Sequence, residues 1–327
     1  MPSKSVSRKS QTMRTGFLNK GAGPTTSASA ELDVSIIICT RNRGEHLRAS
    51  LARMRDLIVP ESWCVELLIV DNGSSDDTRA VVEAAQLPQM SVRYLFAPTP
   101  GKGHAYNAGL AAARGAALLL TDDDTRVPCD WIERMCRPLL DGEADAVQGG
   151  VTIAPHLDRH WLKGVLRTWV AEVRDPEFRP EGLVGANMAF TRRAMALGGA
   201  FDTELGPGAA GFYDDTLFGW SLERAGLRIL YRPSAAVEHH FDPDRLSLQA
   251  FLDTARRMAA SRALVITRIG TAEARPGWSA LLRRLPGLMF RAATQAWRYA
   301  VAKQPDPGFL YHYYQLHLWR ALRRRAA

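Results

Sequence analysis

The chain has 327 residues, of which 46% are hydrophobic and 23% are charged, and a formal net charge of +8 at pH 7. These values are ordinary for a globular protein and exclude disorder over the whole chain. The cysteines form no CxxC pair, which argues against a disulfide scaffold and against a zinc site and favours a reducing compartment; they are Cys39, Cys64, Cys129 and Cys136.

The positive charge lies at the two ends of the sequence. Residues 1–30 contain five basic and no acidic residues, a net charge of +5. Residues 31–245 contain 23 basic and 31 acidic residues, a net charge of −8, and residues 246–327 contain 14 and three, a net charge of +11. Binding to nucleic acid phosphates depends on positive charge across the folded body. The acidic central segment therefore argues against a nucleic-acid partner.

Neither a secretory signal nor a membrane span is predicted. Residues 1–30 are rich in Ser, Thr, Gly and Lys and lack an apolar stretch, so we expect a disordered basic tail there. A spanning helix needs about 20 consecutive apolar residues, and no segment of the sequence provides them. We expect a cytoplasmic protein, with a peripheral position at the inner face of the membrane as a further option.

Strand and helix patterns alternate from residue 34 onward. Apolar, β-branched runs predict strands that are covered on both faces, and these lie at 34–39, 65–70, 92–96 and 116–120. Helical patterns lie between them, at 45–57, 78–85 and 103–113. This alternation predicts an α/β fold with a mostly parallel sheet flanked by helices. Ligands bind beyond the carboxyl ends of the strands in such sheets, so the polar residues that follow each strand should line one crevice.

The pattern is less regular after residue 130. We expect helices over 131–140 and 214–225, and strands over 146–153 and 228–231. From residue 246 apolar residues and arginines recur at helical intervals, with breaks predicted at Pro276, Pro286 and Pro305–Pro307.

Three consecutive aspartates follow the predicted strand over 116–120. In extended geometry Asp122 and Asp124 face the same way, and such a concentration of negative charge at a strand end needs a compensating cation. A hard divalent ion with oxygen ligands would provide it. The alternative is a solvated acidic turn that caps the helix beginning at Trp131.

Other polar residues also have a functional and a structural interpretation. Asp71 could accept a hydrogen bond from a ligand, or cap the following helix. Lys102 lies between glycines before a helix, where an anion is favoured, although neither a P-loop nor a GxGxxG motif is present. Asp214 and Asp215 could be helix-capping acids or contain a general base, and His239 could be a metal ligand or a core residue.

Seven sequence blocks together resemble the family 2 glycosyltransferases, which have the GT-A fold. The blocks span roughly residues 34–241 and occur in this order: VSIIICTRNR, LLIVDNGSSDDT, GKGHAYNAGLAAARG, LLLTDDDT, GANMAFTRR, GGAFD and YDDTLFGWSLERAG…AVEHH. The resemblance implies a transferase that uses a nucleotide-diphosphate sugar as donor. UDP is the usual nucleotide of the donor in this family.

The resemblance also implies roles for individual residues. The matches to donor-binding positions are Thr40, Arg41, Asn42, Asp71, Lys102, Asp122, Asp123, Gly185, Ala186 and Asn187. Asp124 matches the metal-binding acid of the DxD motif, with Asp122 and His239 as further candidate ligands for Mg²⁺ or Mn²⁺. Asp215 matches the catalytic base, next to Asp214 where the family usually has Glu. A single base implies inversion at the anomeric carbon. The QxxRW motif of processive members is absent, which implies a non-processive enzyme.

In this interpretation residues 31–153 form the donor-binding half of the GT-A domain and residues 154–245 the acceptor half. The expected acceptor is a sugar or a lipid-linked saccharide in cell-envelope polysaccharide or glycolipid assembly. A sugar nucleotidyltransferase with a similar metal site and a non-catalytic relative are the alternatives.

Residues 246–327 are expected to form a basic, mainly helical extension. Its arginines include Arg256–Arg257, Arg283–Arg284 and Arg323–Arg325, interleaved with Trp278, Trp297, Trp319 and the aromatic segment 309–314. Basic helices with aromatic anchors bind anionic membrane surfaces. The alternative is a helical subdomain that packs on the GT-A domain, called here the catalytic body, and whose arginines are solvated.

Overall fold

The computed structural model describes residues 32–174, 181–269, 278–302 and 304–326. The tail predicted over residues 1–30 and the helix break predicted at Pro276 lie outside the described residues.

One sheet of eight strands runs through the described residues, in the order β3-β2-β1-β4-β7-β6-β8-β5. The strands are β1 (Val34–Thr40), β2 (Val65–Asp71), β3 (Ser91–Phe96), β4 (Ala117–Asp122), β5 (Thr125–Arg126), β6 (Ala146–Ile153), β7 (Asn187–Thr191) and β8 (Ile229–His239). The neighbours from β3 to β4 are parallel, as are β6 and β8, whereas β7 is antiparallel to both of its neighbours and β5 is antiparallel to β8. The predicted α/β fold with a mostly parallel sheet is confirmed.

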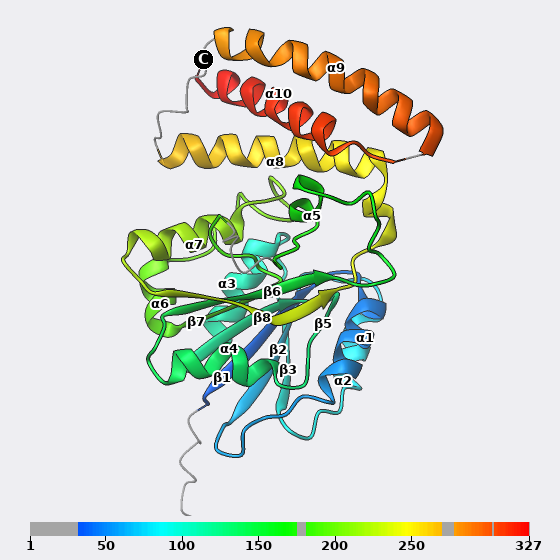
Figure 1. Ribbon diagram of the computed structural model, residues 1–327. Helices are drawn as coiled ribbons and strands as arrows, with labels where there is room; N and C mark the ends of the chain where they lie inside the picture. Colours follow the sequence, from blue (N-terminus) through cyan, green and yellow to red (C-terminus); the bar gives the residue numbers. More distant parts are fainter. Residues whose placement is uncertain (1–31, 175–180, 270–277, 303, 327) are drawn as a thin grey trace, which may run out of the picture. The chain divides into compact units, whose positions relative to one another are not determined.

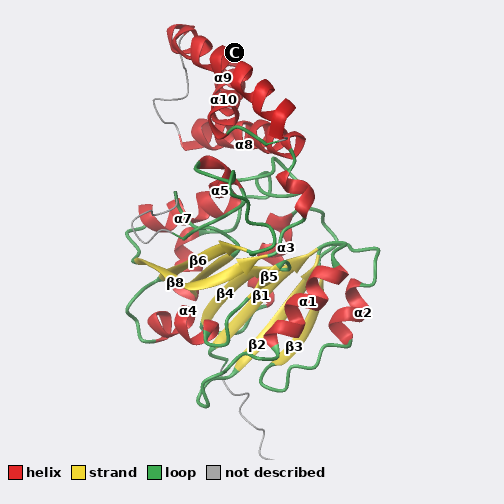
Figure 2. Ribbon diagram, turned by 45° about the vertical axis from the view of Figure 1, so that its right-hand side comes forward, coloured by secondary structure: helices red, strands yellow, loops and turns green. Residues whose placement is uncertain are grey.

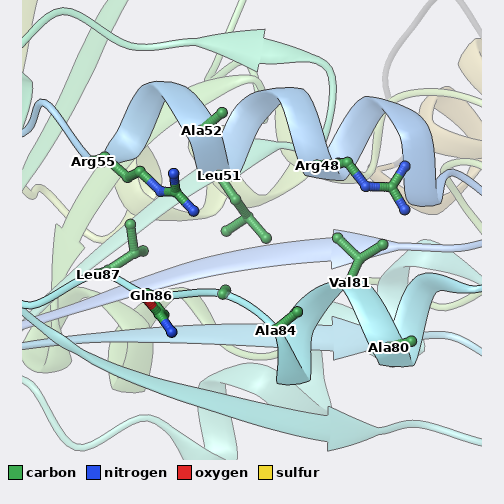
Figure 3. A pocket seen from close by; sticks show the side chains of 10 residues that line it. Arg48, Leu51, Ala52, Arg55, Ala80, Val81, Ala84, Gln86 and Leu87 are labelled. Atoms are coloured by element: carbon green, nitrogen blue, oxygen red, sulfur yellow. The ribbon is translucent and has the colours of Figure 1, made fainter.

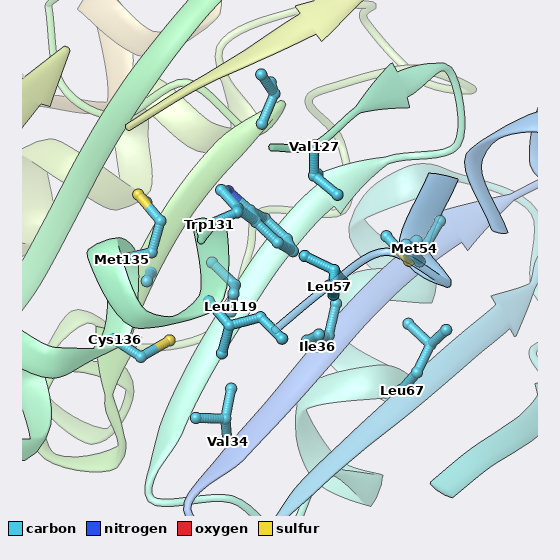
Figure 4. Packing of buried hydrophobic residues seen from close by; sticks show 14 of the residues in the cluster. Val34, Ile36, Met54, Leu57, Leu67, Leu119, Val127, Trp131, Met135 and Cys136 are labelled. Carbon is cyan, nitrogen blue, oxygen red and sulfur yellow. The ribbon is translucent and has the colours of Figure 1, made fainter. Parts of the chain in front are cut away.

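Helices cover both faces of the sheet (Figures 1 and 2). One face packs against α1 (Gly44–Met54), α2 (Thr78–Glu83) and α4 (Trp131–Leu140), and the other against α3 (Lys102–Ala112), α6 (Arg192–Gly198) and α7 (Asp214–Arg224). Alternate residues of β1 enter the two cores, because successive strand side chains point to opposite faces. Ile36 and Ile38 lie in the first core, which Figure 4 shows around Trp131, whereas Ile37 lies in the second.

The C-terminal segment is helical, with α8 (Leu248–Ile269), α9 (Trp278–Ala302) and α10 (Pro307–Ala326). A third apolar cluster joins α8 and α10 to α5 (Val165–Trp169). The predicted break at Pro305–Pro307 is confirmed, but the break at Pro286 is wrong. α9 continues through Pro286, whose ring is exposed; a proline removes only one backbone hydrogen bond, and the helix keeps the others. Within the described residues, no helix has the combined length and apolar character that crossing a membrane would require.

The strand predicted over 228–231 is much longer than expected, because β8 extends to His239 alongside β6. The pairing has an irregularity between Gly149 and Val151 and then resumes, with Ile153 opposite His239. Thr125 of β5 also pairs with His239. Long-range pairing therefore brings His239 to the end of the sheet where the aspartate triplet lies.

Asn187 joins β7 to three other parts of this core. Its side-chain amide donates to the carbonyl oxygens of Gly150 and Ala235, each at 2.7 Å, and its Oδ1 accepts from Trp131 Nε1 at 2.9 Å. The buried Asn187 amide thereby pairs with two backbone carbonyl groups and one indole N–H.

We expect Asn187→Ala to lower the free energy of unfolding by about 2–4 kcal/mol, because it leaves buried carbonyl and indole groups without partners. Urea unfolding followed by circular dichroism measures the change. The control is Gln249→Ala, which removes an exposed hydrogen bond to Asp253 and should change stability by less than about 0.5 kcal/mol. Equal stability of the two variants would contradict the structural role.

Candidate active site

A cleft of about 380 Å³ opens at the carboxyl ends of β1 and β4. Cys39 of β1 lies opposite Asp122 of β4, and Thr40 lies opposite Asp71 of β2. The cleft brings together these predicted site residues: Thr40, Arg41, Lys102, Asp122, Asp123, Asp124, Asp214, Asp215 and His239. The expectation that polar strand ends converge on one crevice is confirmed for β1 and β4.

The aspartate triplet forms a turn. Asp122 is the last residue of β4, and β5 begins at Thr125. Thr125 Oγ1 donates to the Asp122 carbonyl oxygen at 2.9 Å, which closes the turn. The extended backbone that was expected to align Asp122 with Asp124 stops at Asp122, although both residues line the cleft. The Asp122 carboxylate accepts a 2.5 Å hydrogen bond from Lys102 Nζ.

Arg43 compensates the other two aspartates. Its Nη2 donates to Asp124 Oδ2 at 2.7 Å and its Nε lies 3.2 Å from Asp123 Oδ1. Thr40 Oγ1 donates to Asp123 Oδ2 at 2.7 Å. Burial raises the pKa of Asp123 to about 7 in spite of Arg43. Burial also acts to raise the pKa of Asp124, but His239 and Arg43 outweigh it and hold that pKa below its ordinary range.

The His239 imidazole and the Asp124 carboxylate lie next to each other without a hydrogen bond between them. His239 Nδ1 lies 2.9 Å from the Val170 carbonyl oxygen, so Nδ1 must carry a hydrogen and donate. Nε2 lies 3.4 Å from Asp124 Oδ1, a buried oxygen without a hydrogen-bond partner. Metal-bound histidines commonly donate their second ring N–H to a carbonyl in this way. The pair therefore fits a divalent cation.

The described residues contain no group of three His, Cys, Asp or Glu side chains placed to hold a metal. Asp122, the third predicted ligand, is engaged by Lys102. Two protein ligands are nevertheless compatible with Mg²⁺, which is commonly bound by one or two carboxylates together with substrate phosphates.

Two cationic residues of the cleft were not among the predicted site residues. Arg43 lies in the polar run after β1, and that position was the only local signal for it. Arg245 follows β8 in the 3₁₀-helix η1 (Pro243–Leu246), and no local motif marks it. Its guanidinium lies over the Phe241 ring, 5.2 Å from the centroid. Burial lowers its pKa, and Asp124 is the strongest charge that opposes this effect.

Asp214 and Asp215 begin α7 at the other side of the cleft. Asp215 Oδ2 accepts from the Gly185 amide and Oδ1 from the Thr216 amide, both at 2.7 Å. Burial raises the pKa of both carboxyls. For Asp214 the charge of Asp215 adds to burial, and the pKa reaches about 7 even though Lys102 opposes the shift.

The remaining predicted donor-binding residues do not line the cleft. Asp71 is buried and accepts from the Ser74 amide at 2.8 Å and from the Tyr94 hydroxyl at 2.7 Å. Asn42 accepts from the Ser75 amide. The Ala186 carbonyl oxygen accepts from the Thr121 hydroxyl, and the Asn187 side chain is hydrogen-bonded inside the core. Gly185 does not line the cleft itself, but its amide donates to Asp215, which does. Their roles in donor binding stay predictions.

The family model of glycosyl transferase family 2 matches residues 35–197. The chain belongs to this family. It is 28% identical to the succinoglycan biosynthesis protein ExoM of Rhizobium meliloti, over 66% of this chain and 70% of that protein. It is also 25% identical to the glycosyltransferase GlyG of Streptococcus pneumoniae, over 36% of this chain but only 38% of that protein.

A solved structure supports the fold of this glycosyltransferase. The mannosyltransferase PcManGT from Pyrobaculum calidifontis, in complex with GDP-Man and Mn²⁺, aligns with 91% of this chain and 74% of that chain at a TM-score of 0.56 and 19% identity. The GT-A fold is therefore shown, and the family match favours glycosyl transfer over nucleotidyl transfer.

A glycine-rich loop, residues 206–211, borders the cleft. Gly206 has a φ of +74°, and a Cβ there would lie 2.5 Å from Asp214 Cγ. Gly208 has a φ of +89°, and a Cβ there would lie 2.9 Å from Gly101 Cα. The Lys102 amide donates to the Pro207 carbonyl oxygen at 2.9 Å. Only glycine lets this loop approach both the acidic pair and the Lys102 turn so closely.

The C-terminal helices hold the end of this loop. Ser261 of α8 donates to the Ala210 carbonyl oxygen at 3.0 Å. Arg262 lies over the rings of Tyr213 and Trp220, at 5.6 and 5.1 Å from their centroids. Tyr213 itself has a left-handed φ of 73° and immediately precedes Asp214. The extension therefore helps to fix the turn that presents the acidic pair.

A second cavity, of about 430 Å³, lies between α1 and α2 (Figure 3). Leu51 and Val81 approach each other across it, and Arg48 and Arg55 lie at its α1 side. It shares no lining residue with the catalytic cleft and has no carboxylate or imidazole in its lining, so we assign it no part in catalysis.

We expect Arg262→Met to leave the fold intact but to loosen the turn before Asp214, because it removes the cation that joins Tyr213, Trp220 and Glu181. Hydrogen exchange measured by mass spectrometry should show faster exchange in peptides that cover residues 206–216. The control Arg256→Met, on the same helix, removes only a local pair with Asp253 and should leave those peptides unchanged. Unaltered exchange in Arg262→Met would show that α8 does not hold the turn.

Proposed function

We propose that this glycosyltransferase is metal-dependent, inverting and non-processive, and that it moves a sugar from a nucleotide-diphosphate sugar to an acceptor hydroxyl. The observation that carries the proposal is the composition of the cleft at the ends of β1 and β4. A carboxylate–imidazole pair with an unpartnered oxygen lies in the same cleft as an acidic pair with raised pKa values. Perturbed carboxyls gathered in a cleft are typical of catalytic sites.

The nucleotide-diphosphate sugar would enter along the ends of β1 and β4. Thr40 and Arg41 would border the nucleoside, as the family pattern implies. Lys102 and Arg245 line the same cleft and would attract the diphosphate. Lys102 stays protonated, because Asp122 outweighs the burial that acts to lower its pKa.

Asp124 and His239, with Asp122 as the third candidate, would hold the divalent cation. Such an ion supplies Lewis-acid stabilisation of the charge that develops on a leaving diphosphate. The unpartnered Asp124 Oδ1 supports this assignment, since a buried carboxylate oxygen costs free energy until something positive meets it.

Asp215 would accept the proton of the attacking hydroxyl. A positioned base contributes roughly 10²–10⁴-fold to such a step. Its two bonds to backbone amides fix the orientation of the carboxylate. Oδ1 also accepts a longer, 3.4 Å bond from the Thr216 hydroxyl, so Oδ2 is the oxygen that keeps a lone pair for the attacking hydroxyl. With one base and attack opposite the leaving group, the anomeric configuration inverts. The neighbouring buried acid, Asp214, would tune the basicity of Asp215.

The acceptor we propose is a sugar or a lipid-linked saccharide in polysaccharide or glycolipid assembly, in the cytoplasm. The likeness to a succinoglycan biosynthesis protein supports this class. We propose UDP as the nucleotide of the donor, following the usual preference of the family.

A thermal-shift screen of nucleoside diphosphates, each with Mg²⁺, Mn²⁺ or EDTA, tests the donor assignment. We expect one diphosphate to raise the melting temperature only when a divalent ion is present. Product analysis then tests the reaction class, since release of nucleoside diphosphate supports glycosyl transfer and release of pyrophosphate would contradict it.

We expect Asp215→Asn to reduce the transfer rate at least about 10²-fold while donor binding is retained, because the amide cannot take the proton. Transfer is measured as nucleoside diphosphate release, and donor binding by calorimetry. Glu223→Gln removes an exposed acid from the same helix and should transfer at the normal rate. Near-normal transfer by Asp215→Asn would show that another group is the base.

The rate should also fall as the pH is lowered. A base works in its deprotonated form, and burial raises the pKa of Asp215 above the ordinary value of 3.8. Activity should therefore be lost as the pH falls through this raised pKa. A profile of kcat/KM against pH measures the midpoint of the acid limb, and a midpoint at or below 3.8 would contradict the raised pKa.

A further inference from the structure

One face of α9 is apolar and exposed. Met289, Phe290, Trp297 and Val301 have relative exposures of 72%, 68%, 67% and 69%. Their spacing of one, seven and four residues places them on one side of a helix. Ala293, Ala296 and Ala300 are also exposed and fall within the same stripe. We call this stripe, residues 289, 290, 293, 296, 297, 300 and 301, the α9 face. At 1.5 Å per residue it extends about 18 Å along the helix.

The opposite side of α9 packs against α10. Gln295 Oε1 accepts from the Asp306 amide, and a Cβ on Gly308 would lie 2.8 Å from Arg291 Nη1. Similarly, a Cβ on Gly287 would lie 2.8 Å from His312 Nε2. α10 in turn lies between α9 and α8 (Figures 1 and 2), and α8 and α10 share a buried apolar cluster. The α9 face therefore lies on the outer side of this helical layer.

Isolated exposed apolar side chains are normal on soluble proteins, but a contiguous patch marks an interaction surface. Ile58, Phe96 and Leu197 are also exposed, yet they lie on separate elements. The α9 face is different because it concentrates four large apolar side chains on little more than three helical turns.

The surrounding charge identifies the partner. Residues 246–327 carry a net charge of +11. Exposed arginines occur on all three helices, at Arg256, Arg257, Arg291, Arg320, Arg323, Arg324 and Arg325. Of the acids in the described part of this segment, Asp253 is paired with Arg256 and Asp306 is buried. A second copy of the chain would bring like charges together, whereas an anionic lipid surface would complement them.

The residue types also suit the boundary between lipid headgroups and acyl chains. Trp297 is one of the aromatic types enriched at that depth. An amphipathic helix of this kind lies in the plane of the membrane surface and does not cross it.

We propose that α9 docks on an anionic lipid bilayer, with the α9 face inserted at the headgroup–acyl boundary and the net positive charge of the helical layer attracting the anionic lipids. The proposal does not rest on the transfer reaction. It gives the C-terminal extension two separate surfaces: α8 and α10 pack on the catalytic body, and α9 binds membrane.

Flotation of the full chain with vesicles tests the proposal. We expect binding to vesicles of equal parts phosphatidylcholine and phosphatidylglycerol at low salt, and much weaker binding to phosphatidylcholine alone or at high salt. The double substitution Phe290→Glu with Trp297→Glu should lower the partition coefficient at least about tenfold, because two large apolar side chains lose their lipid burial. The matched control, Ile58→Glu with Leu197→Glu, changes two exposed apolar residues outside α9 and should bind as the unaltered chain does.

A second measurement covers the case in which the charged variant does not fold. Phosphatidylglycerol vesicles with brominated acyl chains should quench tryptophan fluorescence of the unaltered chain more strongly than that of Trp297→Phe, since Trp297 is the tryptophan in the α9 face. Absence of vesicle binding, or equal quenching in both proteins, would overturn the proposal. So would a dimer, detected by light scattering, that the α9 substitutions dissociate while vesicle binding is absent, because the face would then join two copies.

Discussion

Negative charge gathered at one end of the sheet is the constraint on which the site depends. Five carboxylates line one cleft, namely Asp122, Asp123, Asp124, Asp214 and Asp215. Carboxylates removed from water are costly unless they are paired. Lys102 pairs with the first, Arg43 with the next two, and the last two have raised pKa values because burial is only partly offset. Compensation of the negative charge is therefore incomplete, as the proposed cation site at Asp124 and the proposed base at Asp215 both require.

The fold delivers these groups from distant parts of the chain. Parallel pairing of β1 with β4 sets Arg43 near the aspartate turn, and the length of β8 brings His239 to Asp124. The Val170 carbonyl oxygen then orients the imidazole. On the other side of the cleft, Arg262 of α8 holds Tyr213 and hence the start of α7. The C-terminal helices are thus part of the support of the catalytic body.

Local sequence patterns predicted most of the sheet and the acidic residues, Lys102 and His239 of the cleft. The strands over 34–39 and 65–70 were placed within one residue, because a doubly covered strand is a continuous apolar run. Features that depend on long-range pairing were missed: the full length of β8, the position of Arg245, and the ion pair between Asp122 and Lys102. The partners of Asn187 are likewise distant in sequence, so its use inside the core could not be read from its motif.

The most direct test of the central claim is calorimetric titration with the nucleoside diphosphate that stabilises the protein best. The incomplete pairing of Asp124 implies that binding to the unaltered chain requires Mg²⁺ or Mn²⁺ and weakens at least about tenfold in EDTA. Asp124→Ala should abolish the dependence on the ion. Equal affinity with and without a divalent ion, or unaltered metal-dependent binding in Asp124→Ala, would contradict a cation site at Asp124 and His239.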